Sequence, residues 1–403
     1  MKHLKKIASM ILCVALLASL SACSMVTVDK EKEANQVVAT VGKTNILKKE
    51  FDKQFNNYAQ ASGYTEEYLK DSANKENVTQ LKKYVLDAMV SDEVAYQWAI
   101  ANGMDLTDEE KQKVKDNLAE TIQTAKENIA SQVMAEASSE PNINVEQEIA
   151  QRQQEQLADI EAPEYVEGSI RYQVLEKFSE SIQNTVTVTD EQVKERYDSE
   201  VGNQKLMLEN IATYQMNIQM GNTVYVYPEG TKAVKNLLIA IPSDKQTQIQ
   251  TLRQNNSTQQ ADELLQQELA KIKGKADEAL AAVQAGGDFD ALIEKYGEDP
   301  GMTSEPGKTK GYYVYPGDTN YVASFVNASL ALQKVGDVSS LVASDYGYHI
   351  IKLINLPEQV VPYDEIKDTL KETMLSSAQN DAITKKRDEL VKAANVTENY
   401  NIL

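Results

Sequence analysis

Two apolar strand patterns in the second half of the chain place the strongest constraint on how it can fold. The first is Val-Lys-Asn-Leu-Leu-Ile at 234–239, and the second is Tyr-Gly-Tyr-His-Ile-Ile-Lys-Leu at 346–353. Gly347 supplies a tight turn before the second strand, because glycine readily adopts backbone conformations that other residues avoid. Alternation along that strand places Ile350 toward a core and leaves His349 pointing elsewhere.

Further sequence pieces lie between these strands in a fixed order. A helix ends in Ala-Gly-Gly-Asp-Phe at 285–289, and a loop follows with Tyr-Gly-Glu-Asp-Pro at 296–300. Gly-Tyr-Tyr comes next at 311–313, and Phe-Val-Asn-Ala-Ser-Leu at 325–330 precedes the second strand. This order and spacing resemble a parvulin-type peptidyl-prolyl isomerase domain. The resemblance implies a domain over 229–356 that consists of a small antiparallel sheet flanked by helices.

Such a domain would act on the peptide bond that precedes proline. Rotation about this bond costs about 18–20 kcal/mol, because the twisted amide loses its resonance. A protein accelerates the rotation without covalent chemistry when it binds the twisted form more tightly than either planar isomer. The reaction therefore needs an apolar cup for the proline ring and a polar site for the reorganising amide. Parvulins have both features: large apolar side chains form the cup, which lies beside a buried network of two histidines and a Cys or Asp.

The resemblance assigns four residues of this chain to the catalytic network. The second histidine of the family falls on His349, and the loop Cys or Asp falls on Asp299. Ser344 stands where the family has a Thr or Ser before the last turn. Asn236 replaces the histidine of the first strand, and its side chain can still donate and accept hydrogen bonds. The alternative is a domain without catalysis, in which His349 is an ordinary core histidine.

The same resemblance assigns four residues to substrate binding. The cup residue of the family's helix motif falls on Phe325, and the apolar residue four positions earlier falls on Tyr321. Leu330 ends that motif. Lys310 departs from the family, because it stands at an apolar cup position of the usual Gly-Gly-Asp-Leu-Gly pattern. Almost any fold would bury a phenylalanine, so exposure of Phe325 in a groove is the observation that distinguishes a cup from a core.

The start of the chain predicts a signal peptide over residues 1–22. Three lysines precede an apolar run at 7–20, and this run is shorter than the ~20 residues that span a membrane. The following Leu-Ser-Ala-Cys at 20–23 resembles the lipobox of bacterial lipoproteins, which implies lipidation of Cys23. A diacylglyceryl group supplies the two chains that stable anchoring requires, so residues 23–36 would form a tether. An ordinary signal peptide is the alternative.

Cysteine, histidine and charge counts exclude several classes of function. The sequence has two cysteines and two histidines, and removal of the signal peptide would leave one of each. The remaining chain could form no internal disulfide and no cysteine- or histidine-pair metal site, so we expect no metal and no cofactor. A net charge of −20 argues against nucleic acid as a partner and favours basic or unfolded polypeptides. A merely solvated acidic surface explains this charge equally well.

Long helical patterns flank the isomerase-like segment on both sides. They carry apolar residues near three-to-four spacing, and two of them begin with a capping box. A hairpin followed by such helices resembles the start of the PrsA and SurA group of extracytoplasmic chaperones. In PrsA-type proteins a C-terminal helix packs back onto the N-terminal helices, so that the isomerase domain is an insertion. The predicted elements are a hairpin at 37–47 and helices at 76–102, 107–137, 164–183, 189–200 and 364–394, within a chaperone domain at 37–228 and a C-terminal segment at 357–403.

Two stretches fit this organisation less directly. Residues 242–273 are rich in Gln, Asn and Ser and separate the first strand of the domain from its first helix. They predict a surface elaboration that ends as an extended helix, and a segment that grips client polypeptides is the alternative. The stretch 201–227 is rich in Met and Tyr, and its pattern is compatible with either strand or helix.

The sequence therefore predicts a mostly helical α+β protein, with an all-α chaperone domain and an inserted parvulin-like domain. The resemblance implies a foldase on the outer face of the cell membrane that acts on unfolded secreted polypeptides with X–Pro bonds. A homodimer is left open. One alternative is a holdase that has lost its isomerase chemistry, which Asn236 and Lys310 favour. Another is a solute-binding lipoprotein, against which the lack of repeated strand–helix alternation counts.

Overall fold

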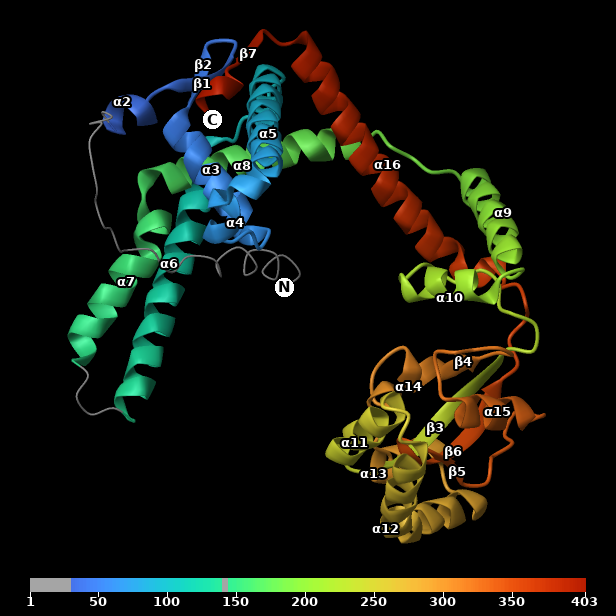
Figure 1. Ribbon diagram of the computed structural model, residues 1–403. Helices are drawn as coiled ribbons and strands as arrows, with labels where there is room; N and C mark the ends of the chain where they lie inside the picture. Colours follow the sequence, from blue (N-terminus) through green and yellow to red (C-terminus); the bar gives the residue numbers. More distant parts are fainter. Residues whose placement is uncertain (1–29, 140–143) are drawn as a thin grey trace. The chain divides into compact units, whose positions relative to one another are not determined.

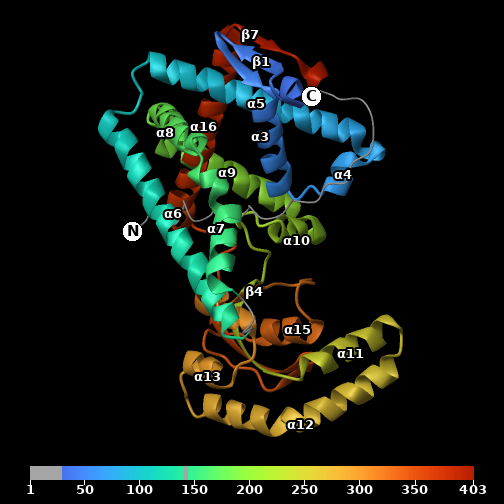
Figure 2. The same ribbon diagram turned by 90° about the vertical axis from the view of Figure 1, so that its left-hand side faces the viewer.

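The computed structural model describes residues 30–139 and 144–403. The predicted signal peptide and the predicted lipidation site Cys23 lie outside the described residues. Among the helices of this part of the chain, none combines the length and the apolar character needed to cross a membrane. Helices dominate, and small antiparallel sheets accompany them (Figures 1 and 2). The predicted mostly helical α+β class is confirmed.

Contacts divide the chain into two compact units. The first contains the described residues up to Thr187 together with Leu375–Leu403, and the second contains Val188–Met374. The boundary between them falls within one continuous helix, α16 (Tyr363–Ala393). The predicted domain boundaries fall at other residues and stay a prediction, because a unit defined by contacts need not coincide with a domain that folds alone.

The first unit contains a three-stranded antiparallel sheet in the order β2-β1-β7. β1 (Val37–Val41) and β2 (Thr44–Leu47) form the predicted hairpin, and Gly42 turns the chain between them with a φ of 60°. β7 (Val396–Glu398) adds a strand from the other end of the sequence. The sequence did not predict β7, because so short a strand shows no periodicity.

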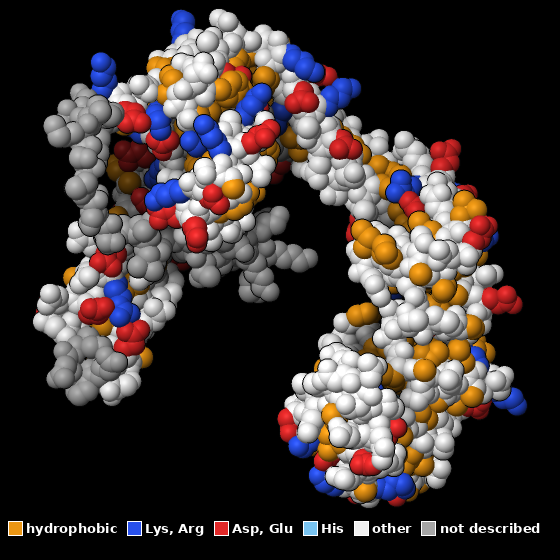
Figure 3. All heavy atoms as spheres, in the orientation of Figure 1, with side chains coloured by type: hydrophobic (Ala, Val, Ile, Leu, Met, Phe, Trp, Pro, Cys, Tyr) orange, Lys and Arg blue, Asp and Glu red, His pale blue; other side chains and the backbone are white. Residues whose placement is uncertain are grey.

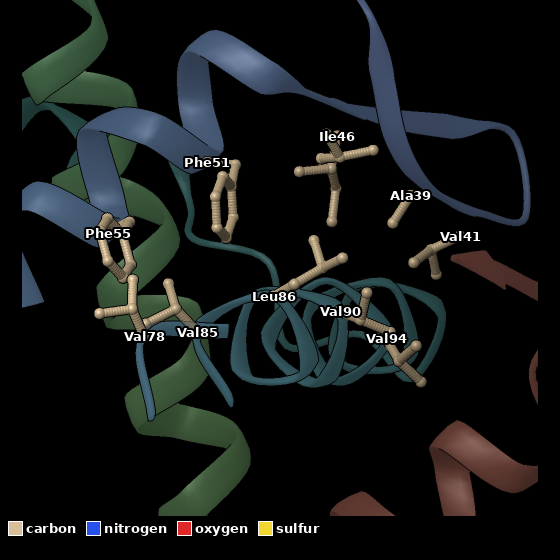
Figure 4. Close-up of a cluster of buried hydrophobic side chains, with 11 residues drawn as sticks. Ala39, Val41, Ile46, Phe51, Phe55, Val78, Val85, Leu86, Val90 and Val94 are labelled. Atoms are coloured by element: carbon tan, nitrogen blue, oxygen red, sulfur yellow. The ribbon is translucent and has the colours of Figure 1, made fainter. Parts of the chain in front are cut away.

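Two helices pack against this hairpin. Apolar residues recur at three- to four-residue spacing on α5 (Lys75–Ala101), so that one stripe of the helix faces the sheet. Figure 4 shows side chains from α5, from α3 (Lys48–Ala61) and from the hairpin converging on one core. Burying one large apolar side chain contributes about 1.5–3 kcal/mol, so this core fixes the hairpin on the helices. The side chains labelled there are Ala39, Val41, Ile46, Phe51, Phe55, Val78, Val85, Leu86, Val90 and Val94.

The predicted capping box begins the longest of the other helices in this unit. Thr107 Oγ1 accepts a hydrogen bond from the Glu110 amide at 3.2 Å, and Glu110 Oε2 accepts one from the Thr107 amide at 2.7 Å. The apolar stripe of that helix, α6, is buried near its two ends, at Val114 and Ile129, and only partly buried between them. Besides α3, α5 and part of α16, the α-helices of this unit are α2 (Lys30–Ala34), α4 (Glu66–Lys70), α6 (Asp108–Ala137), α7 (Val145–Glu161) and α8 (Pro163–Gln183).

The apolar face of α16 is divided between two cores. In the first unit, Leu390 packs against the hairpin core, and Arg387 pairs with Asp92 of α5. In the second unit, Ile366 and Leu370 pack among residues of α9 (Asp190–Met207). The resemblance to PrsA-type proteins had implied that this helix packs onto the N-terminal helices, and Leu390 and Arg387 make contacts of that kind.

The second unit is built around a four-stranded antiparallel sheet in the order β4-β3-β6-β5. α12 and α13 cover one face, and α15 covers the other. His349 does point to the face opposite Ile350, as predicted, but both faces are covered, so His349 is buried as well. This small sheet flanked by helices confirms the implied domain fold. The elements are β3 (Lys232–Ala240), β4 (Tyr312–Val314), β5 (Val342–Ser344), β6 (Gly347–Asn355), α12 (Thr258–Gln284), α13 (Phe289–Tyr296) and α15 (Ala323–Ala331).

The predicted surface elaboration is a pair of helices with a small core of its own. α11 (Ser243–Gln254) and the first part of α12 pack against each other, with Ile249 fully buried between them. Arg253 on α11 donates to both carboxylate oxygens of Asp345, through Nε at 2.5 Å and Nη2 at 2.7 Å. This bidentate pair fastens the helices to the turn between β5 and β6.

The stretch at 201–227 forms the end of α9, then α10 (Ile211–Gln219) and an extended segment. Gln204 joins these parts from a buried position. Its Oε1 accepts a hydrogen bond from the Tyr225 amide at 2.7 Å, and its Nε2 donates to the Thr223 carbonyl at 2.6 Å. A polar side chain therefore fixes the extended segment on α9, and apolar periodicity alone could not predict that contact.

Candidate active site

Strand pairing brings two of the predicted network residues together. Asn236 lies on β3 and His349 lies on β6, and the register places Leu238 opposite His349 and Asn236 opposite Ile351. Because side chains alternate along each strand, the side chains of Asn236 and His349 are diagonal neighbours on the same face of the sheet.

A neighbouring strand and a loop bring the other two network residues to the same place. Ser344 lies at the end of β5, and Asp299 lies in the loop after α13. Asn236 Nδ2 donates to Asp299 Oδ2 at 2.7 Å, and His349 Nδ1 lies 3.1 Å from Asn236 Oδ1. Ser344 Oγ lies 2.7 Å from His349 Nε2. The four residues form one connected chain, and their catalytic role stays a prediction.

The donors and acceptors of this hydrogen-bonded network have a single consistent order. A carboxylate can only accept, so Asn236 turns its Nδ2 to Asp299 and its Oδ1 to His349. His349 must then carry its proton on Nδ1, and its Nε2 must accept the Ser344 hydroxyl proton. Ser344 Oγ accepts in turn from the Tyr346 amide at 3.0 Å. Every hydrogen bond therefore points toward Asp299, the terminal acceptor.

His349 is neutral in this network at physiological pH. Burial lowers the pKa of His349 to about 4, because the charged imidazolium would lose its hydration, and the negative charge of Asp299 offsets this only in part. A neutral ring with a single proton fits the order of donors and acceptors. The imidazole can therefore serve as a fixed hydrogen-bonding group rather than as a cation.

A fifth residue joins the network and was not predicted. Tyr312 on β4 donates its hydroxyl to Asp299 Oδ1 at 2.9 Å. Burial, and secondarily the charge of Asp299, raises the pKa of Tyr312, so the hydroxyl keeps its proton. The next residue along β4, Tyr313, stacks instead on Tyr227 with 4.8 Å between ring centroids. The Gly-Tyr-Tyr pattern cannot say which tyrosine reaches the network, because only strand pairing decides which face each one takes.

Aromatic rings surround the predicted cup residue. The ring centroid of Phe325 lies 5.3 Å from that of His349, 5.5 Å from Tyr321 and 6.3 Å from Tyr312. Phe325 exposes only 2% of its surface, whereas Tyr321 is partly exposed. The structure therefore brings Phe325 and Tyr321 next to the network, but it does not expose Phe325 in an open groove.

The two remaining substrate-binding predictions lie at the margin of this cluster. Leu330 is partly buried and packs against the core that contains Phe325. Lys310 is exposed at the end of α14 (Gly307–Lys310). For a metal, no group of three or more His, Cys, Asp or Glu side chains is suitably placed within residues 30–139 and 144–403.

Comparison with known proteins gives family matches for two separate segments of the chain. Residues 245–355 match the Rotamase family, a PPIC-type peptidyl-prolyl isomerase domain, and residues 1–123 match a SurA-like N-terminal domain. A foldase protein PrsA from Clostridium botulinum is 25% identical over 409 residues, which cover 100% of both chains. One from Geobacillus kaustophilus is 36% identical over 129 residues, or 32% of this chain and 44% of that protein. The crystal structure of PrsA from Bacillus subtilis matches at 18% identity over 89% of this chain and 93% of that chain, with a TM-score of 0.25.

These matches define a class of protein in which SurA-like helices accompany a PPIC-type rotamase domain. The chain carries both of these domains, and it is similar along its whole length to a PrsA foldase. The Rotamase match begins after β3, so it does not include the position of Asn236.

Proposed function

We propose that this protein is an extracytoplasmic foldase that isomerises X–Pro bonds in unfolded secreted polypeptides and is held at the outer face of the cell membrane by a lipid on Cys23. The observation that supports this most directly is the hydrogen-bonded chain from Ser344 to Asp299 beside the ring of Phe325. Fixed polar groups next to an apolar surface are the two things that the reaction requires.

The network would act by binding, without any covalent step. As an X–Pro bond twists, resonance is lost and electron density returns to the nitrogen. Hydrogen-bonding groups that are already held in place stabilise this redistribution without reorganising at the moment of rotation. The chain of bonds that ends on Asp299 holds His349 and Asn236 in this way, while Phe325 would hold the proline ring.

A proline ring can reach Phe325 only when a neighbouring side chain moves, because Phe325 is almost fully enclosed. Tyr321 is the neighbour best placed to do so, since it is partly exposed and lies in the loop before α15. In this proposal Tyr321 swings outward, and the proline ring takes its place against Phe325 and Tyr312.

Apolar side chains on the surface of the second unit support the binding of unfolded clients. Leu206 on α9 and Met216 and Met220 at α10 expose 66%, 63% and 75% of their surface. Figure 3 shows orange side chains at the surface in this region. Methionine adapts to partners of varied shape, and the net charge of −20 favours basic clients over acidic ones.

A holdase that binds polypeptides without isomerising them is the second candidate. Two observations favour it. Phe325 is enclosed rather than exposed, and Lys310 presents an exposed cation where the family has an apolar cup residue.

Isomerisation is tested with a short X–Pro peptide. A holdase that only binds this peptide would not accelerate its cis–trans exchange, so the measurement separates isomerisation from binding. We expect the full-length protein to accelerate cis–trans exchange measured by NMR exchange spectroscopy. Phe325→Leu should reduce this acceleration about tenfold, which corresponds to about 1.4 kcal/mol of lost transition-state binding, because leucine fills the core but offers no flat ring to the proline.

Asn327→Ala, at an exposed position of the same helix, is the matched control and should leave the exchange rate unchanged. If the wild-type protein suppresses aggregation of an unfolded client but leaves peptide exchange at its spontaneous rate, the holdase is correct and the isomerase proposal is wrong.

The lipid anchor is tested by cell fractionation. We expect the full-length chain to appear in the membrane fraction and Cys23→Ser to appear in the soluble fraction, because the variant lacks the sulfur to which the lipid is attached. Cys13→Ser controls for the loss of a cysteine and should stay with the membrane. Retention of Cys23→Ser on the membrane would contradict the proposed anchor.

A further inference from the structure

We propose that Tyr312 and Gly301 together form a positioning device for the network. Gly301 leaves the space in which the Tyr312 hydroxyl reaches Asp299, and that hydrogen bond fixes the carboxylate on which the network ends. The consequence for catalysis rests on the proposed isomerase function, whereas the geometric part of the inference does not.

Tyr312 belongs to both halves of the candidate site. Its hydroxyl donates to Asp299 Oδ1 at 2.9 Å. Its ring lies 5.1 Å from the Tyr321 centroid and 6.3 Å from the Phe325 centroid. Like His349, it therefore joins the polar network to the aromatic cluster, and any movement of its ring displaces a donor from Asp299.

Position 301 requires glycine because there is no room for a side chain, and not because of its backbone conformation. It has no positive φ, so its backbone accepts alanine. A Cβ added to Gly301 would, however, overlap the Tyr312 hydroxyl and lie 3.0 Å from the ring carbon Cζ. Because the Tyr312 ring is held among Tyr321 and Phe325, it cannot yield without moving the aromatic cluster.

Three donors hold the Asp299 carboxylate. Oδ2 accepts from Asn236 Nδ2 at 2.7 Å, and Oδ1 accepts from the Tyr312 hydroxyl at 2.9 Å and from the Gly301 amide at 3.0 Å. Without the hydroxyl, Asp299 keeps, among the described residues, the Gly301 amide and one side-chain donor, Asn236, so Asp299 can turn about the Gly301 bond and the Asn236 amide loses its fixed orientation. That orientation selects the Nδ1 proton of His349, so the loss is transmitted through hydrogen bonds to the ring beside Phe325.

The decisive variant is Tyr312→Phe in the full-length protein, which removes only the hydroxyl. For an X–Pro peptide we expect kcat to fall about tenfold while KM stays within about twofold, because the hydroxyl positions Asp299 and the ring that contacts the peptide remains. Tyr313→Phe, the neighbouring tyrosine on the other face of β4, is the matched control and should change neither constant. A purely structural role would lower the melting temperature of Tyr312→Phe without this split.

The second variant, Gly301→Ala, tests the shared space. We expect it to lower kcat by a similar factor, because the new methyl group displaces the Tyr312 hydroxyl. Combined with Tyr312→Phe it should add little, since the bond it breaks is already absent. Additive losses would show that Gly301 and Tyr312 act independently and would overturn the inference.

A third measurement does not depend on catalysis. The imidazole ¹⁵N signals of His349, identified by their loss in His349→Gln, should report a single Nδ1-protonated ring in the wild-type protein and a mixture of tautomers in Tyr312→Phe. If the wild-type protein does not isomerise peptides, the proposed function fails, and these signals still decide the inference. If they are identical in wild type, Tyr312→Phe and Tyr313→Phe, the positioning role is wrong whether or not the protein is an isomerase.

Discussion

Asn236→Asp is expected to lower the free energy of unfolding by about 3 kcal/mol or more at neutral pH and to abolish isomerisation. The change hardly alters the shape of a side chain that is only 3% exposed. It replaces the Nδ2 donor, 2.7 Å from Asp299 Oδ2, with a second acceptor that carries a negative charge. Two carboxylates then face each other in a site shielded from water, where like charges repel strongly.

Acidification should partly rescue this variant. A proton shared between the two carboxyl groups restores a hydrogen bond at the position of the lost amide donor, so the deficit relative to wild type should shrink as the pH falls. Urea unfolding at about pH 7.5 and about pH 5 measures the effect. Asn327→Asp adds the same charge at an exposed site and should cost less than about 0.5 kcal/mol. Equal losses in the two variants, or a deficit that grows in acid, would contradict the assigned direction of the network.

The stability of the wild-type protein is expected to fall between pH 6.5 and pH 4 because of His349. Its pKa is lowered from 6.5 to about 4 by burial. Above this window the imidazole is neutral in both the folded and the unfolded state, so it does not make the stability depend on pH. Within the window the unfolded state takes up a proton that the folded state does not, so stability decreases as the pH falls. Below it both states are protonated, and the accumulated loss amounts to roughly 3 kcal/mol.

The contribution of His349 is isolated by comparison with His349→Gln, which keeps a polar side chain but does not titrate in this range. The pH dependence of the urea midpoint should be flatter in this variant. Buried Asp318 works in the opposite direction, because burial raises the pKa of Asp318 and the folded state then binds its proton more readily than the unfolded state. Taking the difference between the two proteins removes this opposing contribution. Identical curves for both would show that His349 is not desolvated in the folded protein.

The network residues could be named from the sequence because the order of its motifs resembles that of the parvulin family, which assigns a residue to each position of the network. The pattern of β3 and β6 defines which residues share a face, and the order of motifs places the Asp299 loop near them. The substitution at Asn236 was visible as a departure. Its consequence was not visible, because whether an amide can replace an imidazole depends on the groups at its two ends, and these come from distant parts of the chain.

The aromatic half of the site was predicted less completely. The structure brings Phe325 and Tyr321 beside the network, but the enclosure of Phe325 follows from how α15 packs on the sheet, which no local pattern records. The role of Lys310 in substrate binding stays a prediction, since its side chain is exposed rather than part of the aromatic cluster. The Gly-Tyr-Tyr motif contains Tyr312 but assigns it no role, because two adjacent tyrosines are equivalent until their strand has a partner.

The sequence alone determined the class of fold, because periodicity and turn-forming glycines are local properties of the chain, and the resemblance of its ordered motifs to the parvulin family named the network residues. The tertiary structure decided the direction of the hydrogen bonds, the neutral state of His349 and the closeness of Tyr312 to Asp299. These depend on desolvation and on contacts between residues far apart in sequence, and both arise only when the folded chain brings those residues together.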